Sequence, residues 1–290
     1  MAIFKRNGEK LEYDQSQDLF LEKLYESLAG RCLLKVLTKP VITELGGAFM
    51  NSSLSKGQIN SFVEKNNIDL NLYESQDYHS YNDFFTRTIK DGVRHIDMDE
   101  NALIAPCDSK LTVYPIEDTL QLKIKNSVYT IEDLLMSPAL ADEYRGGLCL
   151  VFRLTVDDYH HYHFIDDGTA DKDHFIKGVF HTVNPIASDY YPIYKTNSRS
   201  YTVLHTKHFG DVVQMEVGAM MVGKITNLNK KTFKRGEEKG YFEFGGSTII
   251  LLTQKGAVLP RKNILYRSAR GEETRIRQGE KIGKVNNNQR

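Results

Sequence analysis

Two glycines precede one serine in the segment Phe244-Gly245-Gly246-Ser247-Thr248, which leads into an apolar run near the C-terminus. Glycine allows backbone conformations that other residues adopt only at a cost, and such conformations often occur at functional sites. A serine hydroxyl held against the preceding carbonyl can attack it, which would cleave the chain and create a protein-derived cofactor. A Gly-Gly turn before a buried strand is the competing interpretation of these five residues.

Three histidines lie within four residues in the segment Asp158-Tyr159-His160-His161-Tyr162-His163. Histidine is the side chain best suited to move protons near neutral pH. In a regular strand His161 and His163 would share one face and His160 would point the other way. His160 and His163 can therefore reach one site only if the chain turns or bulges near Tyr162. Metal binding is the alternative, but no H-E-x-x-H pattern or cysteine accompanies the cluster, and we expect no metal.

One acid, Asp108, lies in a short turn that Pro106 fixes just before a β-rich run. On its own Asp108 is typical of a turn or cap residue. The functional interpretation is a carboxylate that orients a histidine, as in a Ser-His-Asp arrangement. The order along this chain would then be Asp108, His163 and Ser247, and unrelated folds show that such an order is not diagnostic.

The composition is that of an ordinary globular protein of 290 residues, with 38 Lys and Arg against 38 Asp and Glu. Zero formal charge gives no overall attraction to nucleic acid, and we expect no nucleic-acid partner. The basic run at residues 224–239 is interpreted as a solvated loop or as a contact with anionic lipid. The cysteines are Cys32, Cys107 and Cys149, whose spacing fits neither a metal motif nor a disulfide framework, which indicates a reducing compartment.

The chain is expected to fold as an α+β protein, with an N-terminal helical layer on a β-rich body of mostly antiparallel strands. Apolar residues at helical spacing, a helix restart at Pro40, and capping patterns at Ser55 and Ser80 predict helices in the first hundred residues. After residue 100, short β-rich runs follow at residues 110–116, 148–155, 201–205, 212–217, 221–225 and 248–253. We expect a helical, membrane-surface-associated region at residues 1–95 and a catalytic domain at residues 96–290.

Membrane-spanning and secreted classes are not favoured. The N-terminus carries charges too early for a signal peptide. No stretch approaches the ~18 apolar residues of a spanning helix. The protein is therefore expected to be soluble or to lie on a membrane surface, and an apolar stripe with interleaved basic residues near the N-terminus allows an interfacial helix.

Six stretches, at residues 81–87, 105–108, 158–163, 208–212, 217–223 and 239–248, together resemble the phosphatidylserine decarboxylase family. They follow one another in family order, and the Gly-Ser-Thr site combined with Asp-Tyr-His-x-x-His is the specific part. The first 75 residues match only loosely. Two positions depart from the pattern. His161 stands where the family usually has Arg, and this replacement would weaken a phosphate contact. Phe164 stands where the family commonly has Pro or Met.

The resemblance implies a self-processing proenzyme. Asp108, His163 and Ser247 would form the processing triad, in which Ser247 attacks the carbonyl of Gly246. The chain would be cut between residues 246 and 247 into a larger β chain and a smaller α chain, which stay together. Ser247 would become a pyruvoyl group, the only cofactor. It would hold the substrate as a Schiff base and accept the electrons released with CO₂, and His160 would then return a proton to the α-carbon.

The expected reaction is the conversion of phosphatidylserine to phosphatidylethanolamine at an anionic membrane surface. The resemblance also implies a homodimer that is peripheral on the cytoplasmic face of the cell membrane. A pyruvoyl-dependent decarboxylase of a soluble, for example aromatic, amino acid is the enzyme alternative. An unprocessed homologue that only binds lipid, and a metal-dependent hydrolase built on the histidines, are the alternatives from other classes.

Overall fold

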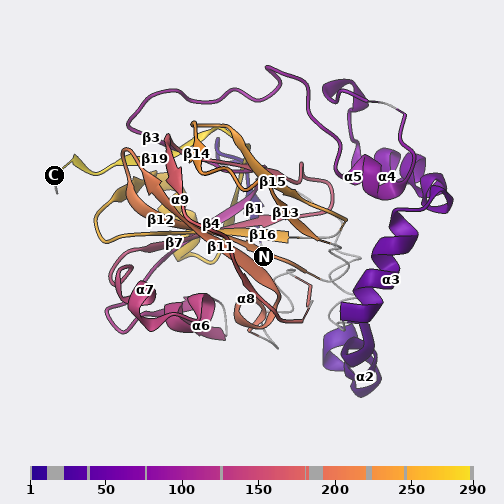
Figure 1. The fold of residues 1–290 in the computed structure, drawn as a ribbon, viewed down its shortest axis with the longest axis horizontal. Coiled ribbons are helices and arrows are strands. Elements are labelled where there is room, and N and C mark those ends of the chain that lie inside the picture. The colour runs from indigo at the N-terminus through magenta and orange to yellow at the C-terminus, as the bar shows by residue number, and fades with distance from the viewer. Residues whose placement is uncertain are drawn as a thin grey trace.

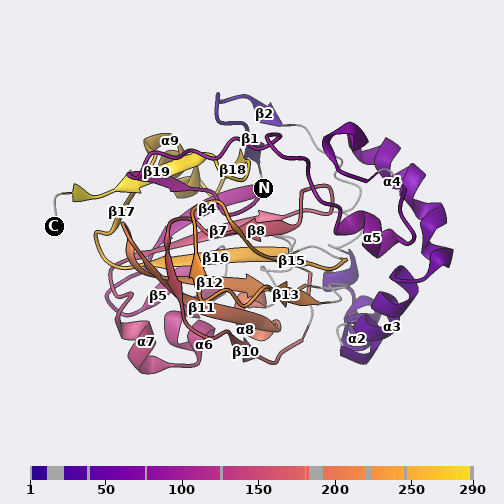
Figure 2. The same ribbon diagram turned by 45° about the horizontal axis from the view of Figure 1, so that its top comes forward.

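A large antiparallel sheet forms the centre of the molecule, and a layer of helices lies along one side of it (Figures 1 and 2). The computed structural model describes residues 2–11, 23–37, 40–75, 77–124, 127–179, 181–182, 192–219, 224–244 and 247–287. In these ranges the strands are mostly antiparallel, and the chain has the expected α+β fold.

The helices in the described ranges are α2 (Leu28–Leu37), α3 (Pro40–Met50), α4 (Ile59–Asn66), α5 (Tyr81–Phe85), α6 (Ile131–Leu135), α7 (Pro138–Asp142), α8 (Ile193–Thr196) and α9 (Lys262–Ala269), with short 3-10 helices at Ser53–Gln58 and Leu70–Leu72. The strands are β1 (Ile3–Phe4), β2 (Lys10–Leu11), β3 (Ala102–Ile104), β4 (Ser109–Pro115), β5 (Gln121–Ile124), β6 (Ser127–Thr130), β7 (Leu148–Leu154), β8 (His161–His163), β9 (Gly168–Ala170), β10 (His174–Ile176), β11 (Arg199–Thr206), β12 (Gly210–Val217), β13 (Ile225–Asn227), β14 (Thr232–Phe233), β15 (Glu238–Phe242), β16 (Ser247–Thr253), β17 (Val258–Pro260), β18 (Glu273–Ile276) and β19 (Lys281–Val285).

Strand β16 runs through the middle of the large sheet, whose order is β14-β9-β11-β12-β16-β7-β4-β18-β1-β2, with β10 paired to β11. Every residue of β16 is buried, as the run of Ile and Leu predicts for a strand covered on both faces. The expected strands at residues 110–116, 148–155, 201–205, 212–217 and 248–253 are confirmed as β4, β7, β11, β12 and β16. The run at 221–225 lies mostly outside the described residues.

Three small sheets complete the described part of the body. One has the order β13-β15-β8 and carries the histidine segment, the second has the order β17-β19-β3, and the third is the pair β5-β6. The first eleven residues also belong to the body, because β1 pairs with β18 and with β2. The helical texture expected of the first hundred residues therefore begins only after this short hairpin.

The helical layer consists of α2 to α5, which follow one another down one side of the body (Figure 1). The predicted restart at Pro40 is confirmed, since α2 ends at Leu37 and α3 begins at Pro40. Ser80 caps α5 as predicted, accepting a hydrogen bond from the backbone of Asp83. The capping role of Ser55 is wrong, because its hydroxyl donates to preceding carbonyls and accepts from a backbone amide at the start of α5.

No helix within the described ranges has the length and apolar character needed to cross a bilayer.

Candidate active site

Ser247 is the first residue of β16 and is held between two neighbouring strands. It pairs with Leu154 of β7, and the next residue, Thr248, pairs with Val217 of β12. Its side chain is fully buried, and its Oγ makes no hydrogen bond in the described part of the chain. A buried hydroxyl without a partner is costly and points to a functional role. Gly245 and Gly246, with the predicted cleavage bond, lie outside the described residues.

The segment that leads into Ser247 is anchored by helix α5. The backbone amide of Phe244 donates to the side-chain oxygen of Asn82 at 2.8 Å. The ring of Phe244 makes edge contacts with Tyr81 and Phe85, at centroid distances of 5.0 and 5.5 Å. The helical layer thus holds Phe244, while the large sheet holds Ser247.

His160 is fully buried beside α5, with its ring 4.2 Å from that of Phe85. Its Nδ1 lies 2.9 Å from the carbonyl oxygen of Asp158, so Nδ1 carries the proton and donates it. Its Nε2 is buried, has no hydrogen-bond partner in the part of the chain that the structure describes, and therefore keeps its lone pair. Burial lowers the pKa of His160 to about 4, while the nearby charge of Asp158 acts in the opposite direction. The ring is therefore neutral at pH 7 and able to accept a proton at Nε2.

The loop before His160 is fixed by a buried ion pair. The ammonium of Lys110 lies 2.6 Å from Oδ2 of Asp158, which also accepts from the backbone amide of Thr155 at 2.7 Å. Burial by itself would raise the pKa of Asp158, but the charge and hydrogen bonds of Lys110 outweigh it, and the pKa is lowered. An ionised Asp158 with these bonds holds the loop, and with it the tautomer of His160.

His163 ends strand β8, directly opposite Glu238 of β15. Its backbone amide donates to the carbonyl of Pro106 at 2.9 Å, which joins the histidine strand to the turn that carries Asp108. Its Nδ1 is buried without a hydrogen bond. Burial lowers the pKa of His163 to about 4, and the charge of Glu238 acts in the opposite direction. This ring is also neutral at pH 7.

The turn that carries Asp108 is hydrogen-bonded to the backbone of His163, but the carboxylate of Asp108 is bound by other groups. Arg94 donates to both of its oxygens, and the backbone amide of Gln278 donates to Oδ1 at 2.8 Å. Within the described residues no hydrogen bond joins Asp108 to His163. The structure thus brings the segments of Asp108 and His163 together, but the pairing between this acid and this base is not formed. Among the described residues no hydrogen bond joins either side chain to Ser247 Oγ, so the triad stays a prediction.

His161 is enclosed between two tyrosines. Its ring stacks on Tyr159 at 4.6 Å and on Tyr241 at 5.2 Å. Its Nε2 lies 3.1 Å from the carbonyl oxygen of Thr86 at the end of α5, and its Nδ1 lies 3.0 Å from the carboxylate of Glu238. The ring therefore ties the end of α5 to the histidine strand and to Glu238 of β15. The weakened phosphate contact at this position stays a prediction.

Phe164, the second departure from the family pattern, has a packing role. Its ring stacks on that of Phe233 at 4.0 Å, in a small buried cluster with Leu204. The rings of His160 and His163 have different neighbours: His160 contacts α5, whereas Tyr159 lies 6.5 Å from His163. Among the described residues, no ring contact or hydrogen bond joins the two histidines directly.

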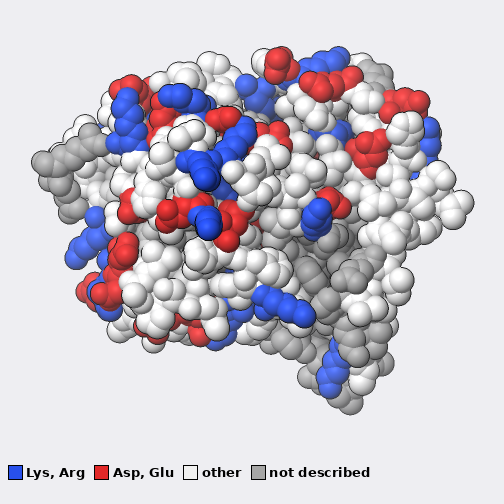
Figure 3. All heavy atoms as spheres, viewed as in Figure 1, with Lys and Arg blue, Asp and Glu red and all other residues white. Residues whose placement is uncertain are grey.

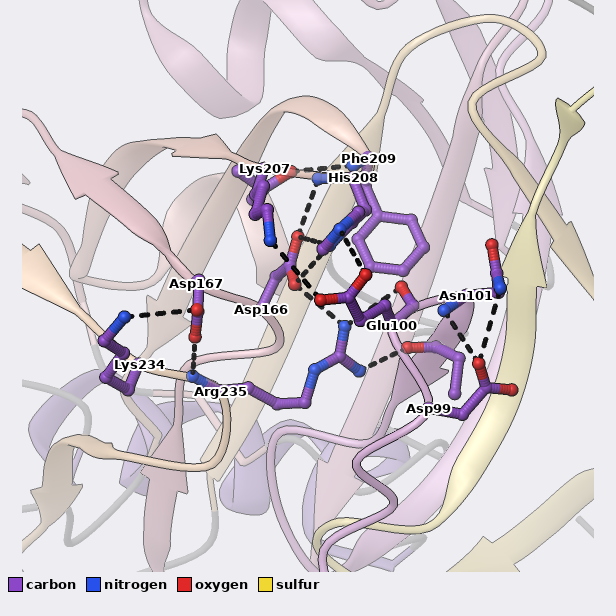
Figure 4. Close-up of polar contacts among 12 residues, drawn as sticks. Asp99, Glu100, Asn101, Asp166, Asp167, Lys207, His208, Phe209, Lys234 and Arg235 are labelled. Carbon is purple, nitrogen blue, oxygen red and sulfur yellow. Dashed lines mark hydrogen bonds and ion pairs between the residues drawn. The ribbon is translucent and has the colours of Figure 1, made fainter.

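A buried ionic network beyond β8 anchors the strand that carries the histidines (Figure 4). Asp166 accepts from Arg235 at 2.8 Å, and its two oxygens accept from the ring and the backbone amide of His208. Glu100 reaches the same histidine from the surface, at 3.6 Å. The carboxylate of Asp166 thus joins its own turn to the turns that carry His208 and Arg235, and Glu100, which precedes β3, contacts the same histidine. Sequence reasoning missed this network, although His208 lies in one of the six family stretches.

Much of the basic run at 224–239 is used inside the protein. Arg235 pairs with Asp166, Lys230 lies 2.6 Å from Glu237, and buried Lys239 lies 2.9 Å from Glu216. Figure 3 shows basic and acidic side chains intermixed over this face of the body. The interpretation of this run as a contact with anionic lipid is therefore not supported by a free basic patch.

The predicted reacting groups are shielded from water. Ser247 and His160 are fully buried, and His163 is 8% exposed. Two neighbouring surface cavities, of about 520 and 360 Å³, are lined by other residues. Among the described residues, no three His, Cys, Asp or Glu side chains gather as a metal-binding group. A closed, dry site protects reactive intermediates from hydrolysis.

Comparison with known proteins identifies relatives along nearly the whole chain. The model of a family described as phosphatidylserine decarboxylase matches residues 81–284, from the start of α5 into β19. The chain is 46% identical over 288 residues to phosphatidylserine decarboxylase proenzyme 2 of Clostridium acetobutylicum, with 99% of each chain covered. It is 41% identical to the phosphatidylserine decarboxylase proenzyme of Clostridium tetani, with 97% of this chain and 94% of the relative covered. It is 39% identical to that of Clostridium novyi, with 98% and 99% covered.

Proposed function

Because the chain belongs to the phosphatidylserine decarboxylase family, we propose that it converts phosphatidylserine to phosphatidylethanolamine and CO₂ after cutting itself between residues 246 and 247. The observation that carries the proposal is the hydroxyl of Ser247. It is fully buried, has no hydrogen-bond partner among the described residues, and begins a central strand directly after the Gly-Gly pair. Burying a hydroxyl without a hydrogen bond lowers stability, so this arrangement is unfavourable for a serine with only a structural role. It is suited to a serine that acts as a nucleophile.

In this proposal His163 removes the proton from Ser247 Oγ as the oxygen attacks the carbonyl carbon of Gly246. The neutral ring of His163 is in the protonation state that a base requires. The resulting ester opens by elimination, which frees the carboxylate of Gly246 and leaves dehydroalanine at residue 247. Water then hydrolyses the dehydroalanine with loss of ammonia and leaves a pyruvoyl group, which would supply a carbonyl that accepts electrons during decarboxylation. The negative charge of Asp108 stabilises His163 in its protonated form while the hydroxyl attacks.

His160 has a separate task in the proposed reaction. The amine of phosphatidylserine arrives as an ammonium and must lose a proton before its nitrogen can bond a carbonyl carbon. The buried lone pair on Nε2 of His160 is suited to accept it, since Nδ1 is held by Asp158. The same proton is then available to the α-carbon after CO₂ has left. His160 therefore returns a proton that it first receives from the substrate.

We also propose that helix α3 rests on the membrane surface. Val41, Leu45 and Phe49 recur at helical spacing and are 62%, 63% and 44% exposed, and Leu54 beyond the helix is 80% exposed. The visible, described surface over α3 carries few charged side chains (Figure 3). Burying each such side chain in lipid stabilises the bound state by about 1.5–3 kcal/mol at full burial. The same layer holds the segment before Ser247 through α5, which would bring the site to the headgroups.

The first test is the intact mass of the purified protein under denaturing conditions, with Ser247→Ala alongside. We expect two chains from the wild-type protein, the smaller one beginning with a pyruvoyl group, and one chain of 33.2 kDa from the variant. Release of CO₂ from carboxyl-labelled phosphatidylserine in vesicles should accompany the two chains. A single uncleaved chain in both samples would refute the proposal.

The second test separates the lipid substrate from a soluble amino acid. The triple change Val41→Ser, Leu45→Ser and Phe49→Ser should weaken sedimentation with phosphatidylserine vesicles at least tenfold. A matched control changes Leu265 and Tyr266, which are 39% and 63% exposed on α9, to Ser. Equal vesicle binding by both variants would contradict the role of α3, and turnover of free amino acids without vesicles would favour the other substrate class. The proposed homodimer can be tested on the same samples by light scattering.

A further inference from the structure

The carboxylate of Asp108 is bound by two segments that are remote from it in the chain. Arg94 donates from Nε to Oδ1 at 3.0 Å and from Nη2 to Oδ2 at 2.6 Å. The backbone amide of Gln278 donates to Oδ1 at 2.8 Å. The side chains of Arg94 and Asp108 are each 11% exposed, so this is a largely desolvated pair.

Arg94 reaches Asp108 from the segment between α5 and β3, which crosses the body outside the regular elements (Figure 1). That segment is fastened further along, where the amide of Asp97 donates to the carbonyl of Gly279 at 3.0 Å. Gly279 has a φ of +79° and follows Gln278 in the turn between β18 and β19. The two donors to Asp108 therefore come from segments that also bind each other.

The geometry restricts the carboxylate in two ways. A guanidinium that donates in parallel to both oxygens fixes the plane of a carboxylate, which a lysine or a water cannot do. Its positive charge also attracts the carboxylate, which opposes any movement of Asp108 away from the guanidinium. Because no described hydrogen bond joins Asp108 to His163, the acid can act on that histidine only through its placed charge or after a small movement. Both depend on where Arg94 holds it.

We propose that Arg94 is a positioning residue for self-processing: it holds the carboxylate of Asp108 in a fixed place and plane while His163 activates Ser247. The proposal rests on the self-cleavage proposed above. Arg94 has no task in decarboxylation, since Asp108 serves only the processing step. Gln278 lies in the α chain and Asp108 in the β chain, so their bond also joins the two products of cleavage.

The test uses gel densitometry to measure how fast freshly refolded precursor splits into two chains. It compares four variants of the Arg94–Asp108 pair with one control variant. Arg94→Gln should slow the splitting by about 10–100-fold, and Arg94→Lys should slow it less. Arg94→Gln combined with Asp108→Asn should be no slower than Asp108→Asn alone, because Arg94 acts only through the carboxylate that Asp108→Asn already removes. The matched control is Arg267→Gln, which removes a similarly buried pair with Glu272 (side chains 14% and 16% exposed) on another part of the body.

A second measurement excludes a merely structural role. Arg94→Gln left until fully processed should decarboxylate at the wild-type rate per pyruvoyl chain. The inference is overturned if Arg94→Gln splits as fast as the Arg267→Gln control, if its effect adds to that of Asp108→Asn, or if the processed variant is slow. A wild-type precursor that never splits would refute the proposed function instead, so the two failures are distinguishable.

Discussion

The burial of His163 predicts an unusual pH dependence of self-processing. Only the neutral ring can take the proton of Ser247, and burial lowers the pKa of His163 to about 4. At pH 5.5 a histidine with that pKa is about 97% neutral, whereas one with the ordinary value of 6.5 is about 9% neutral. Processing at pH 5.5 should therefore run about tenfold faster than an exposed histidine base would allow, and it should decline only toward pH 4.

The assay refolds denatured precursor at a series of pH values and follows the appearance of the two chains. Folding must be checked at each pH by circular dichroism, because His160 and His163 both have folded pKa values near 4, below the 6.5 of the unfolded chain. The unfolded chain binds more protons between these values, so stability falls as pH drops from 6.5 to 4, by on the order of 3 kcal/mol per histidine. A processing rate that halves near pH 6.5 while the fold is intact would refute the reasoning.

Three further predictions concern groups that lie away from the reacting atoms. Arg235→Gln leaves its carboxylate partner charged and buried, so it should lower the free energy of unfolding by about 3–5 kcal/mol, measured by urea denaturation; a change below 1 kcal/mol would contradict the network. A thiol reagent should modify only exposed Cys32 in the native protein, because burial raises the pKa of Cys107 well above its usual value and that of Cys149 to about 12; reaction of all three thiols before unfolding would contradict this. Gly240→Ala would place a Cβ 2.2 Å from a carbonyl oxygen of β13, so its melting temperature should fall by several degrees, and an unchanged value would show that the two strands can separate freely.

The parts of the fold that the sequence predicted are those that depend on neighbours in the chain. Strand β16 follows from a continuous apolar run, and the cap at Ser80 follows from a serine placed three residues before the amide that it accepts from. Ser55 lies four residues before α4, whose first turn follows Gln58, and its hydroxyl accepts instead from the amide of Tyr81 in another helix. A local pattern therefore predicts a cap only when no amide from elsewhere in the fold takes the side-chain oxygen.

The supporting contacts of the site could not be predicted in this way. Arg94 and Asp108 are 14 residues apart, and Asp166 and Arg235 are 69 apart, so their pairing depends on how the sheets assemble. The sequence did mark His161 as a departure from the family pattern. The two flanking tyrosines that explain it come from the residues before β8 and from β15, which only the fold brings together.

The sheet topology explains how a chain cut after residue 246 could remain one folded body. The proposed α chain contributes β16, β18 and β19, and each pairs with strands of the β chain: β16 with β12 and β7, β18 with β4 and β1, and β19 with β3. A buried ion pair between Arg153 and Glu273, with donor–acceptor distances of 2.8 and 2.6 Å, also crosses the cut. Release of the smaller chain would expose both neighbours of a fully buried strand and leave a buried charge without its partner. Cleavage before Ser247 therefore removes one backbone restraint at the start of β16 and leaves its pairing with both neighbours in place, so the precursor and the processed enzyme should share one fold around the new N-terminal group.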